Sequence, residues 1–277
     1  MTKKKEIKAK ENPDLSYKKL SIQISLNGLS FCVLDAVEHT IVKQESMLFT
    51  DELIPFQVLK NLQQLLEKHE ITKMSFSDVT VIHRNSLFSI VPKALFNEEE
   101  VVNYLKFNTK ILANDHIAYD EIANYEIINV YVPFMNINNY IYDLFGDFEY
   151  KHNGTVLIES LLNNFNGGKD SICYVHILEQ QIDITVIENK KLLLYNSFSY
   201  QTKEDFIYYI LFIIEQLKLD SETLKLRLFG TVEEGDDLYN LCYRYVRHVD
   251  VYLPTNLSYH IENKKDEIID FTTLSAL

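Results

Sequence analysis

The hydrophobic and polar positions near the start of the chain predict three strands. Leu20–Leu26, Ser30–Val37 and Ile41–Phe49 are apolar stretches of strand length that follow one another closely. Asn27-Gly28 separates the first two stretches, and this dipeptide is a strong signal for a tight hairpin turn. The pattern therefore predicts a three-stranded antiparallel meander.

The spacing of apolar residues changes after this meander. They recur at the interval of one helix face: Phe56, Leu59, Leu62, Leu65 and Leu66. This spacing predicts a helix. Ser75–His83 and Leu87–Val91 then have the composition of strands, and Pro92 ends the second of them.

The second half of the chain repeats this order. Ile172–Leu178, Ile182–Glu188 and Lys191–Tyr200 predict three more strands joined by short turns. Lys203–Leu217 predicts a helix that is apolar nearly all round, so we expect it to be buried on most sides. Lys225–Phe229 predicts the strand that follows. The unit of three strands, a helix and a strand recurs at an offset of roughly 150 positions, which indicates two related halves.

These patterns divide the chain into a tail and two halves. We expect residues 1–18 to form a flexible tail, because this Lys-rich end has the composition of a solvated segment. The first half is predicted at 19–165, with an inserted segment at 93–150 that interrupts the repeat. The second half is predicted at 166–277, and we expect its last segment, 256–277, to pack back on the first half.

The middle of the chain carries landmarks of a known fold. They are the strand Leu87–Val91 with Pro92, Glu98-Glu99 at the start of a helix, Tyr119-Asp120, the strand, helix and glycine of Ile127–Gly146, the short strand at Phe148, and the helix Gly154–Phe165. In this order of elements the chain resembles the actin-like ATPase superfamily. Within it, the chain is most similar to the pilus-assembly protein PilM and the cytoplasmic part of the secretion protein GspL.

This resemblance covers roughly residues 20–255. It implies an α/β, two-lobed actin-like ATPase (ribonuclease H-like) fold with duplicated mixed sheets flanked by helices. It also implies membership of an uncharacterised bacterial family with this fold.

Composition narrows the class of protein. The formal net charge is −13, whereas nucleic-acid binders carry a basic surface, so we expect no nucleic-acid partner. The longest apolar run, Phe206–Ile214, is far shorter than the ~20 residues that span a bilayer, so we expect no membrane-embedded segment.

Cys32, Cys173 and Cys242 are far apart and odd in number, which predicts buried reduced thiols in a cytoplasmic protein. The eight histidines lack the spacing of metal ligands.

The resemblance also says where a nucleotide would lie. Actin-like ATPases hold it between the lobes, with glycine-rich turns against the phosphates and carboxylates on the strands for Mg²⁺. The first turn of this chain keeps Ser25, Asn27 and Gly28, and the late turn of the second half keeps Gly230. These four residues are the candidate nucleotide-binding residues.

The same turns depart from the pattern of the superfamily. Gln23 and Ser25 stand on the first strand where an Asp is expected, and His176 stands where an Asp-x-Gly would lie. Ordinary turns also explain Gly28 and Gly230. We therefore predict no catalytic residue, no metal ligand and no ATP or Mg²⁺ cofactor. Asp78 and the pair His83-Arg84 flank a strand of the first half, and we interpret them as rim residues.

Three functions remain in competition. The first is a pseudo-ATPase, a non-catalytic actin-like scaffold that binds a protein partner in the cytosol. The alternative is a divergent ATP-binding switch or ATPase of the same superfamily. The third is an unrelated enzyme or an RNA-associated factor on the same scaffold.

Overall fold

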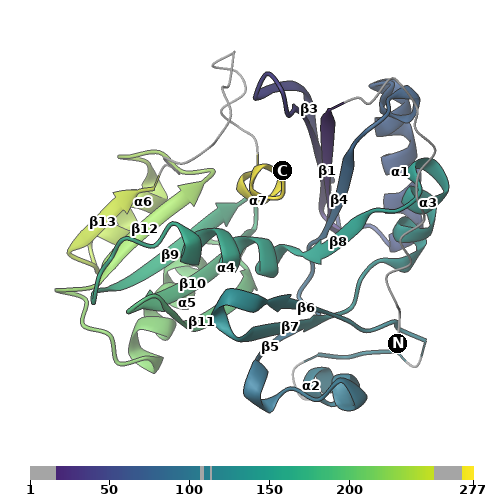
Figure 1. The fold of residues 1–277 in the computed structure, drawn as a ribbon. Coiled ribbons are helices and arrows are strands. Elements are labelled where there is room, and N and C mark those ends of the chain that lie inside the picture. The colour runs from purple at the N-terminus through teal and green to yellow at the C-terminus, as the bar shows by residue number, and fades with distance from the viewer. Residues whose placement is uncertain (1–16, 107–108, 113, 253–269) are drawn as a thin grey trace.

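The structure is a computed structural model that describes residues 17–106, 109–112, 114–252 and 270–277. The predicted tail lies almost wholly outside the described residues, and so do residues 253–269 of the C-terminal part. Figure 1 shows two large lobes and, below and between them, a smaller sheet. Each lobe is built on a five-stranded sheet, and the smaller sheet has three strands.

The first lobe has the strand order β3-β2-β1-β4-β8. Its strands are β1 (Lys18–Ile24), β2 (Gly28–Asp35), β3 (Thr40–Leu48), β4 (Asp78–His83) and β8 (Glu149–His152). Two helices, α1 (Pro55–Lys68) and α3 (Met135–Phe145), pack against this sheet. The predicted helical spacing is confirmed, because α1 buries Val58, Leu62, Leu65 and Leu66 in the core of this lobe.

The second lobe repeats this arrangement with the order β11-β10-β9-β12-β13. Its strands are β9 (Ser171–Leu178), β10 (Gln181–Glu188), β11 (Lys191–Ser199), β12 (Lys225–Gly230) and β13 (His248–Val251). Both sheets are mixed: β1 and β9 each pair antiparallel with the next strand and parallel with β4 or β12. The predicted duplication of three strands, a helix and a strand is confirmed.

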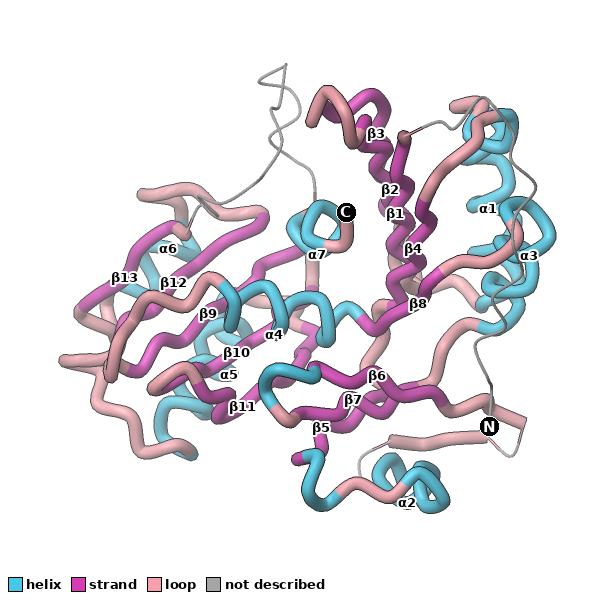
Figure 2. Tube along the Cα trace, in the orientation of Figure 1, coloured by secondary structure: helices cyan, strands magenta, loops and turns pink. Residues whose placement is uncertain are grey.

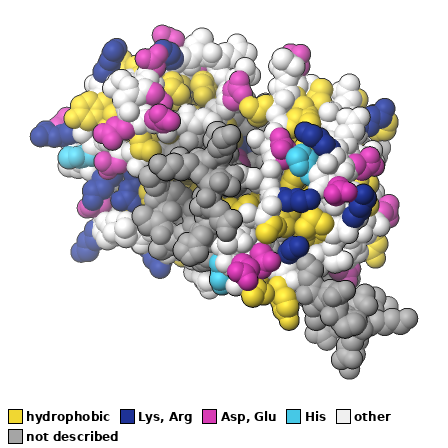
Figure 3. Space-filling view, turned by 90° about the horizontal axis from the view of Figure 1, so that it is seen from above, with side chains coloured by type: hydrophobic (Ala, Val, Ile, Leu, Met, Phe, Trp, Pro, Cys, Tyr) yellow, Lys and Arg dark blue, Asp and Glu magenta, His cyan; other side chains and the backbone are white. Residues whose placement is uncertain are grey.

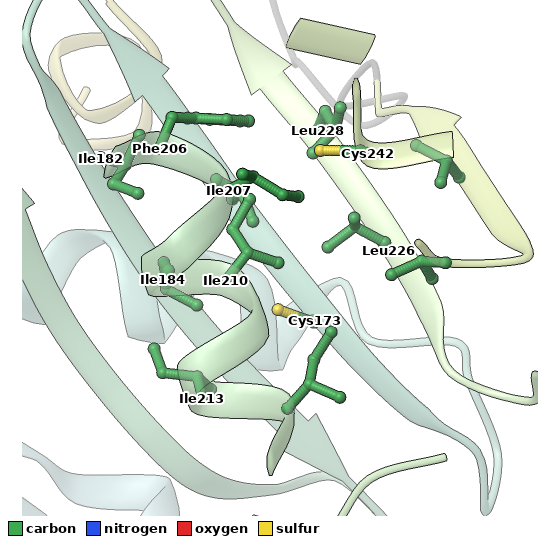
Figure 4. Packing of buried hydrophobic residues seen from close by; sticks show 14 of the residues in the cluster. Cys173, Ile182, Ile184, Phe206, Ile207, Ile210, Ile213, Leu226, Leu228 and Cys242 are labelled. Atoms are coloured by element: carbon green, nitrogen blue, oxygen red, sulfur yellow. The ribbon is translucent and has the colours of Figure 1, made fainter. Parts of the chain in front are cut away.

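Helix α5 (Lys203–Gln216) covers the second sheet together with α6 (Asp237–Tyr243). Figure 4 shows Phe206, Ile210 and Ile213 of α5 packed over the strands. The expectation that this helix is buried on most sides was wrong. Tyr208 and Phe212 are exposed and stack on each other on its outer side, because no element covers that side within the described residues.

The third sheet comes from the inserted segment. It has the order β5-β7-β6, with β5 (Phe88–Pro92), β6 (Ala118–Ile122) and β7 (Ile127–Tyr131). Helix α2 (Val101–Lys106) packs on it through Leu105.

Each lobe sends one helix onto the other lobe. Helix α4 (Asn153–Asn163) follows the first lobe, yet Leu157 and Leu161 pack with Tyr174 of the second sheet. Helix α7 (Phe271–Ser275) follows the second lobe, yet it contacts β1, where the Ser21 hydroxyl donates to the carbonyl of Thr273 at 2.7 Å. Figure 2 shows both helices between the two lobes, so their ends help to build the region where the lobes meet.

The three cysteines are all buried thiols, as predicted. Cys173 and Cys242 lie in the core of the second lobe (Figure 4), and burial raises the pKa of the Cys242 thiol to about 12. Among the described helices, none combines the length and apolarity that a transmembrane segment needs. In the view of Figure 3, Lys and Arg side chains lie among Asp and Glu side chains and do not gather into a basic face.

Candidate functional site

Arg84 links the two lobes at the point where they meet. It follows β4, and its backbone N–H donates to the carbonyl of Ile24 at 2.8 Å, directly before the first turn. Its guanidinium forms an ion pair with Asp183 of β10 and approaches Gln181 Oε1 at 3.4 Å beside the second turn. Arg84 is only 3% exposed and His83 is fully buried, so the interpretation of these two residues as rim residues was wrong. Only Asp78, the third residue, is exposed.

Asp183 is a fully buried carboxylate with every oxygen engaged. Its Oδ2 atom meets Arg84, and its Oδ1 atom accepts from the Ser197 hydroxyl at 2.6 Å. Burial opposes the charge of this carboxylate, but the Arg84 guanidinium and the hydrogen bonds outweigh it and hold the pKa of Asp183 below its usual range. A buried charge of this kind is stable only with such partners.

A second carboxylate reaches the same arginine from the start of α7. Asp270 Oδ2 lies 3.8 Å from Arg84 Nη1, and Asp270 Oδ1 accepts from the backbone N–H of Thr272 at 2.9 Å. Burial again opposes ionisation, while His176, Arg84 and the hydrogen bonds hold the pKa of Asp270 below its usual value. The guanidinium therefore lies between the buried carboxylate of Asp183 and the mostly buried carboxylate of Asp270.

His176 lies beside this ion pair and stacks on Phe229, with ring centroids 4.7 Å apart and an interplanar angle of 9°. Its Nδ1 atom is 3.6 Å from Asp183 Oδ2, outside hydrogen-bond range. Within the described residues, some buried polar atoms of this region have no hydrogen-bond partner: both ring nitrogens of His176, Arg84 Nη1 and Asn153 Oδ1.

The first candidate turn is closed on itself. The N–H of Ser25 donates to Gly28 O at 2.9 Å, and the N–H of Asn27 donates to Ser25 Oγ at 3.2 Å. The segment after β3 covers the turn, because Phe49 N–H donates to Asn27 O at 2.8 Å. A Cβ on Gly28 would lie 2.7 Å from Met47 O, so this glycine lets β3 approach the turn.

Gly230 has a comparable structural role in the second lobe. Its φ is +95°, a conformation that side chains rarely adopt, and a Cβ would overlap the carbonyl oxygen of Ile177. Thr231 N–H donates to this same oxygen at 2.8 Å. The structure thus brings Gly230 to His176 and Ile177, while Ser25, Asn27 and Gly28 form the separate first turn.

These residues do not fit a magnesium nucleotide. Magnesium requires carboxylate oxygens, yet those of Asp183 already meet Arg84 and Ser197. Gln23, which stands in the place of the expected Asp, is hydrogen-bonded to the Thr272 hydroxyl of α7. Within the described residues, no group of three or more His, Cys, Asp or Glu side chains could hold a metal ion.

Sequence reasoning missed Asp183 and Asp270 and assigned Arg84 to the rim. A signal existed for Asp183, because it interrupts a strand that is apolar on both sides between Ile182 and Ile184. A carboxylate in such a strand needs a buried partner. The sequence could not identify Arg84 as that partner, since 99 positions separate the two residues.

Comparison with known proteins places the sequence in a family. A family model described as "Protein of unknown function (DUF3822)" matches residues 8–249. No curated protein matches the sequence significantly.

Two solved structures share the fold over almost the whole chain. The first, from Bacteroides thetaiotaomicron, is described as a protein with actin-like ATPase fold and unknown function. It is 22% identical, with a TM-score of 0.74, and the match covers 88% of this chain and 94% of that one. The second is the PilM–PilN type IV pilus biogenesis complex, at 10% identity and a TM-score of 0.55, covering 93% and 94%. The predicted actin-like ATPase fold and its likeness to PilM are therefore confirmed.

Proposed function

The chain belongs to the DUF3822 family of proteins of unknown function, and from this premise we propose that it is a non-catalytic actin-like scaffold that binds a protein partner in the cytoplasm. One observation carries the non-catalytic part of the proposal. The region between the lobes, where the fold would hold a nucleotide, is closed by an ion pair of this chain's own residues, Arg84 and Asp183. Arg84 supplies the positive charge that balances the Asp183 carboxylate, a part that a magnesium ion would otherwise take.

The two turns support this proposal. Phosphate binding in this fold needs backbone N–H groups that are free to point at the ligand. In the first turn, Ser25 and Asn27 direct their N–H groups to acceptors within the turn. In the second, His176-Ile177-Leu178 places branched and aromatic side chains where glycines would be needed.

The protein partner is supported by the structural neighbour. PilM shares this fold over nearly its full length, and it was solved as part of a complex with PilN. A scaffold that lacks a working nucleotide site would act through its surface. The fold does not identify that partner, so the search for its binding site turns to the surface.

Calorimetric titration with MgATP tests the non-catalytic part. We expect no binding in the low micromolar range, because the phosphates would meet engaged amides and a net charge of −13. The alternative, a divergent ATP-binding switch, has one observation in its favour: among the described residues, the buried Arg84 Nη1 donor has no hydrogen-bond partner. Tight binding that is lost in Ser25→Ala or Asn27→Ala, with the thermal midpoint unchanged, would establish this alternative and refute the proposal.

A further inference from the structure

Two sheets of the molecule end side by side. Strand β11 is the edge of the second-lobe sheet, and β5 is the edge of the three-stranded sheet. The two strands come together where the rings of Phe88 and Tyr195 lie 5.1 Å apart. A groove of about 1430 Å³ lies between the strands and is lined by Ile90 and Pro92 on one side and by residues 190–196 on the other.

The backbone in this groove is available for pairing. In the described part of the chain, residues 88–92 and 191–196 form backbone hydrogen bonds only within their own sheets. Both strands line the groove, and within the described residues their outer edges have no backbone partner. An extended segment of another chain can pair with such edges by adding a strand. At about 3.3 Å per residue, the stretch 191–196 offers a pairing length of roughly 20 Å.

Strand β11 is also the least protected long edge. Strands β8 and β13 have four residues each, which is too short to recruit a strand securely. Strand β3 is as long as β11, with nine residues, but it carries Lys43 and Glu45 in its middle. In β11 the single charged residue is Lys191 at its first position. Charges on edge strands discourage pairing, so their absence from the rest of β11 favours it.

A β-bulge supplies an apolar anchor in the groove. Leu192 pairs with Ile187 and Leu194 pairs with Val186, so Leu193 is the extra residue of the ladder. Its side chain is 43% exposed and lines the groove. Bulges redirect side chains out of the regular pleat, and here the redirected side chain is a large hydrophobic one.

The charges of the groove indicate the character of its occupant. Lys190 and Lys191 lie at one end, and neither forms an ion pair with a described residue. Glu126 is the one carboxylate among the lining residues. The groove is thus basic on balance in a chain whose net charge is −13. An acidic segment fits this end better than a basic one.

We propose that this groove binds an extended segment of the protein partner, which adds a strand to β11, packs an apolar side chain on Leu193 and places acidic residues beside Lys190 and Lys191. This assignment rests on the proposed function, because it locates the surface through which the scaffold acts. It requires no nucleotide and no movement of the lobes.

Selection of binders from a displayed library of random dodecapeptides tests the groove directly. We expect the purified chain to enrich peptides with alternating apolar residues and an acidic end. Leu193→Glu should weaken their binding at least ~10-fold, because a carboxylate replaces the apolar anchor and repels the acidic end. Lys190→Glu combined with Lys191→Glu should weaken binding and reduce its dependence on salt.

The matched control is Val42→Glu, on the long edge strand β3. Val42 is 44% exposed, so the change has the same chemistry on an edge strand of the other lobe. If no peptide is enriched, or if Val42→Glu weakens binding as much as Leu193→Glu, the groove is not the binding site. Copurification of a native partner that binds equally to wild type and Leu193→Glu would retain the proposed function and refute only the groove.

Discussion

At the scale of single residues, hydrogen bonds hold two buried histidines of the first lobe in the neutral form. His83 Nε2 contacts Asn138 Oδ1 at 2.9 Å, and its Nδ1 atom accepts the backbone N–H of Phe134 at 3.2 Å. His152 is held in the same way, since Nδ1 accepts from Gly154 N–H at 3.0 Å. Each ring thus uses Nδ1 as an acceptor, which only the neutral form can do.

Acidification should therefore destabilise the protein through His83. Burial lowers the pKa of this imidazole to about 3, so below pH 6.5 the unfolded chain binds a proton that the folded protein refuses. The free energy of unfolding then falls by about 1.4 kcal/mol per pH unit for this group. His83→Gln should lower the free energy of unfolding by about 1–3 kcal/mol at neutral pH, because it removes the acceptor of Phe134 N–H. It should also remove this group's contribution of about 1.4 kcal/mol per pH unit from the acid slope.

Urea unfolding at several pH values between 4 and 7 measures this slope. His248→Gln, at an exposed position of β13, is the control for losing an imidazole. Burial raises the pKa of Asp120 to about 6, so protonation of Asp120 stabilises the folded protein in acid and opposes the effect of His83. The quantity to compare is therefore the difference in slope between variant and wild type. Parallel slopes for wild type and His83→Gln would contradict the assignment of a neutral His83.

At the scale of elements, the approach of β12 to β9 depends on one glycine. Gly230 ends β12 with a φ of +95°, next to the carbonyl oxygen of Ile177. Gly235 has nearly the same φ, +91°, but has nothing within 4 Å of the place where a Cβ would stand. The two glycines therefore separate the cost of backbone strain from the cost of a steric clash.

Gly230→Ala should destabilise the protein more than Gly235→Ala. Strain alone should cost Gly235→Ala about 1–2 kcal/mol. Gly230→Ala adds an overlap with backbone, which should raise the loss by a further ~1–3 kcal/mol. Chemical denaturation of both variants measures the difference. Equal losses would show that β12 can move away from β9, and that Gly230 is available for another role.

The order of the elements was predictable, because each long strand and helix has its own periodic pattern. The predicted strand at Ile182–Glu188 and the helix at Lys203–Leu217, for example, match β10 and α5 within one residue or two. Strands β6 and β13 were not predicted, since the charged residues in AYDEI and HVDV interrupt the short apolar run that marked β5 and β7. The turns lie where the sequence predicted turns, but other contacts that cover them come from residues farther along the chain, such as Phe49 and Arg84.

At the scale of the whole molecule, the two lobes are held together by exchanged helices and one buried ion pair. Phe271 of α7 packs on Phe229 of the second lobe, with ring centroids 5.2 Å apart. The neighbouring Thr273 accepts from Ser21 of the first lobe. Arg84 and Asp183 add an electrostatic link between the same lobes. This arrangement favours a fixed relation between the lobes over the opening and closing that a nucleotide switch would need.

A double-mutant cycle on Arg84 and Asp183 tests whether the ion pair holds the lobes together. Arg84→Met or Asp183→Asn alone should lower the free energy of unfolding by about 3–5 kcal/mol, because each leaves a buried charge without its partner. The double variant should lose clearly less than the sum of the two single losses, since neither member of the pair is then left charged without the other. Asp270 loses Arg84 in both variants that carry Arg84→Met, so that cost cancels in the cycle. Hydrogen exchange should show faster opening of α4 in the single variants, because this helix lies between the lobes.

The control cycle is Lys203→Met with Asp237→Asn, an exposed ion pair within the second lobe, for which we expect no measurable coupling. Additive losses at Arg84 and Asp183 would mean that the exchanged helices alone fix the lobes, and that Arg84 is free to serve a ligand.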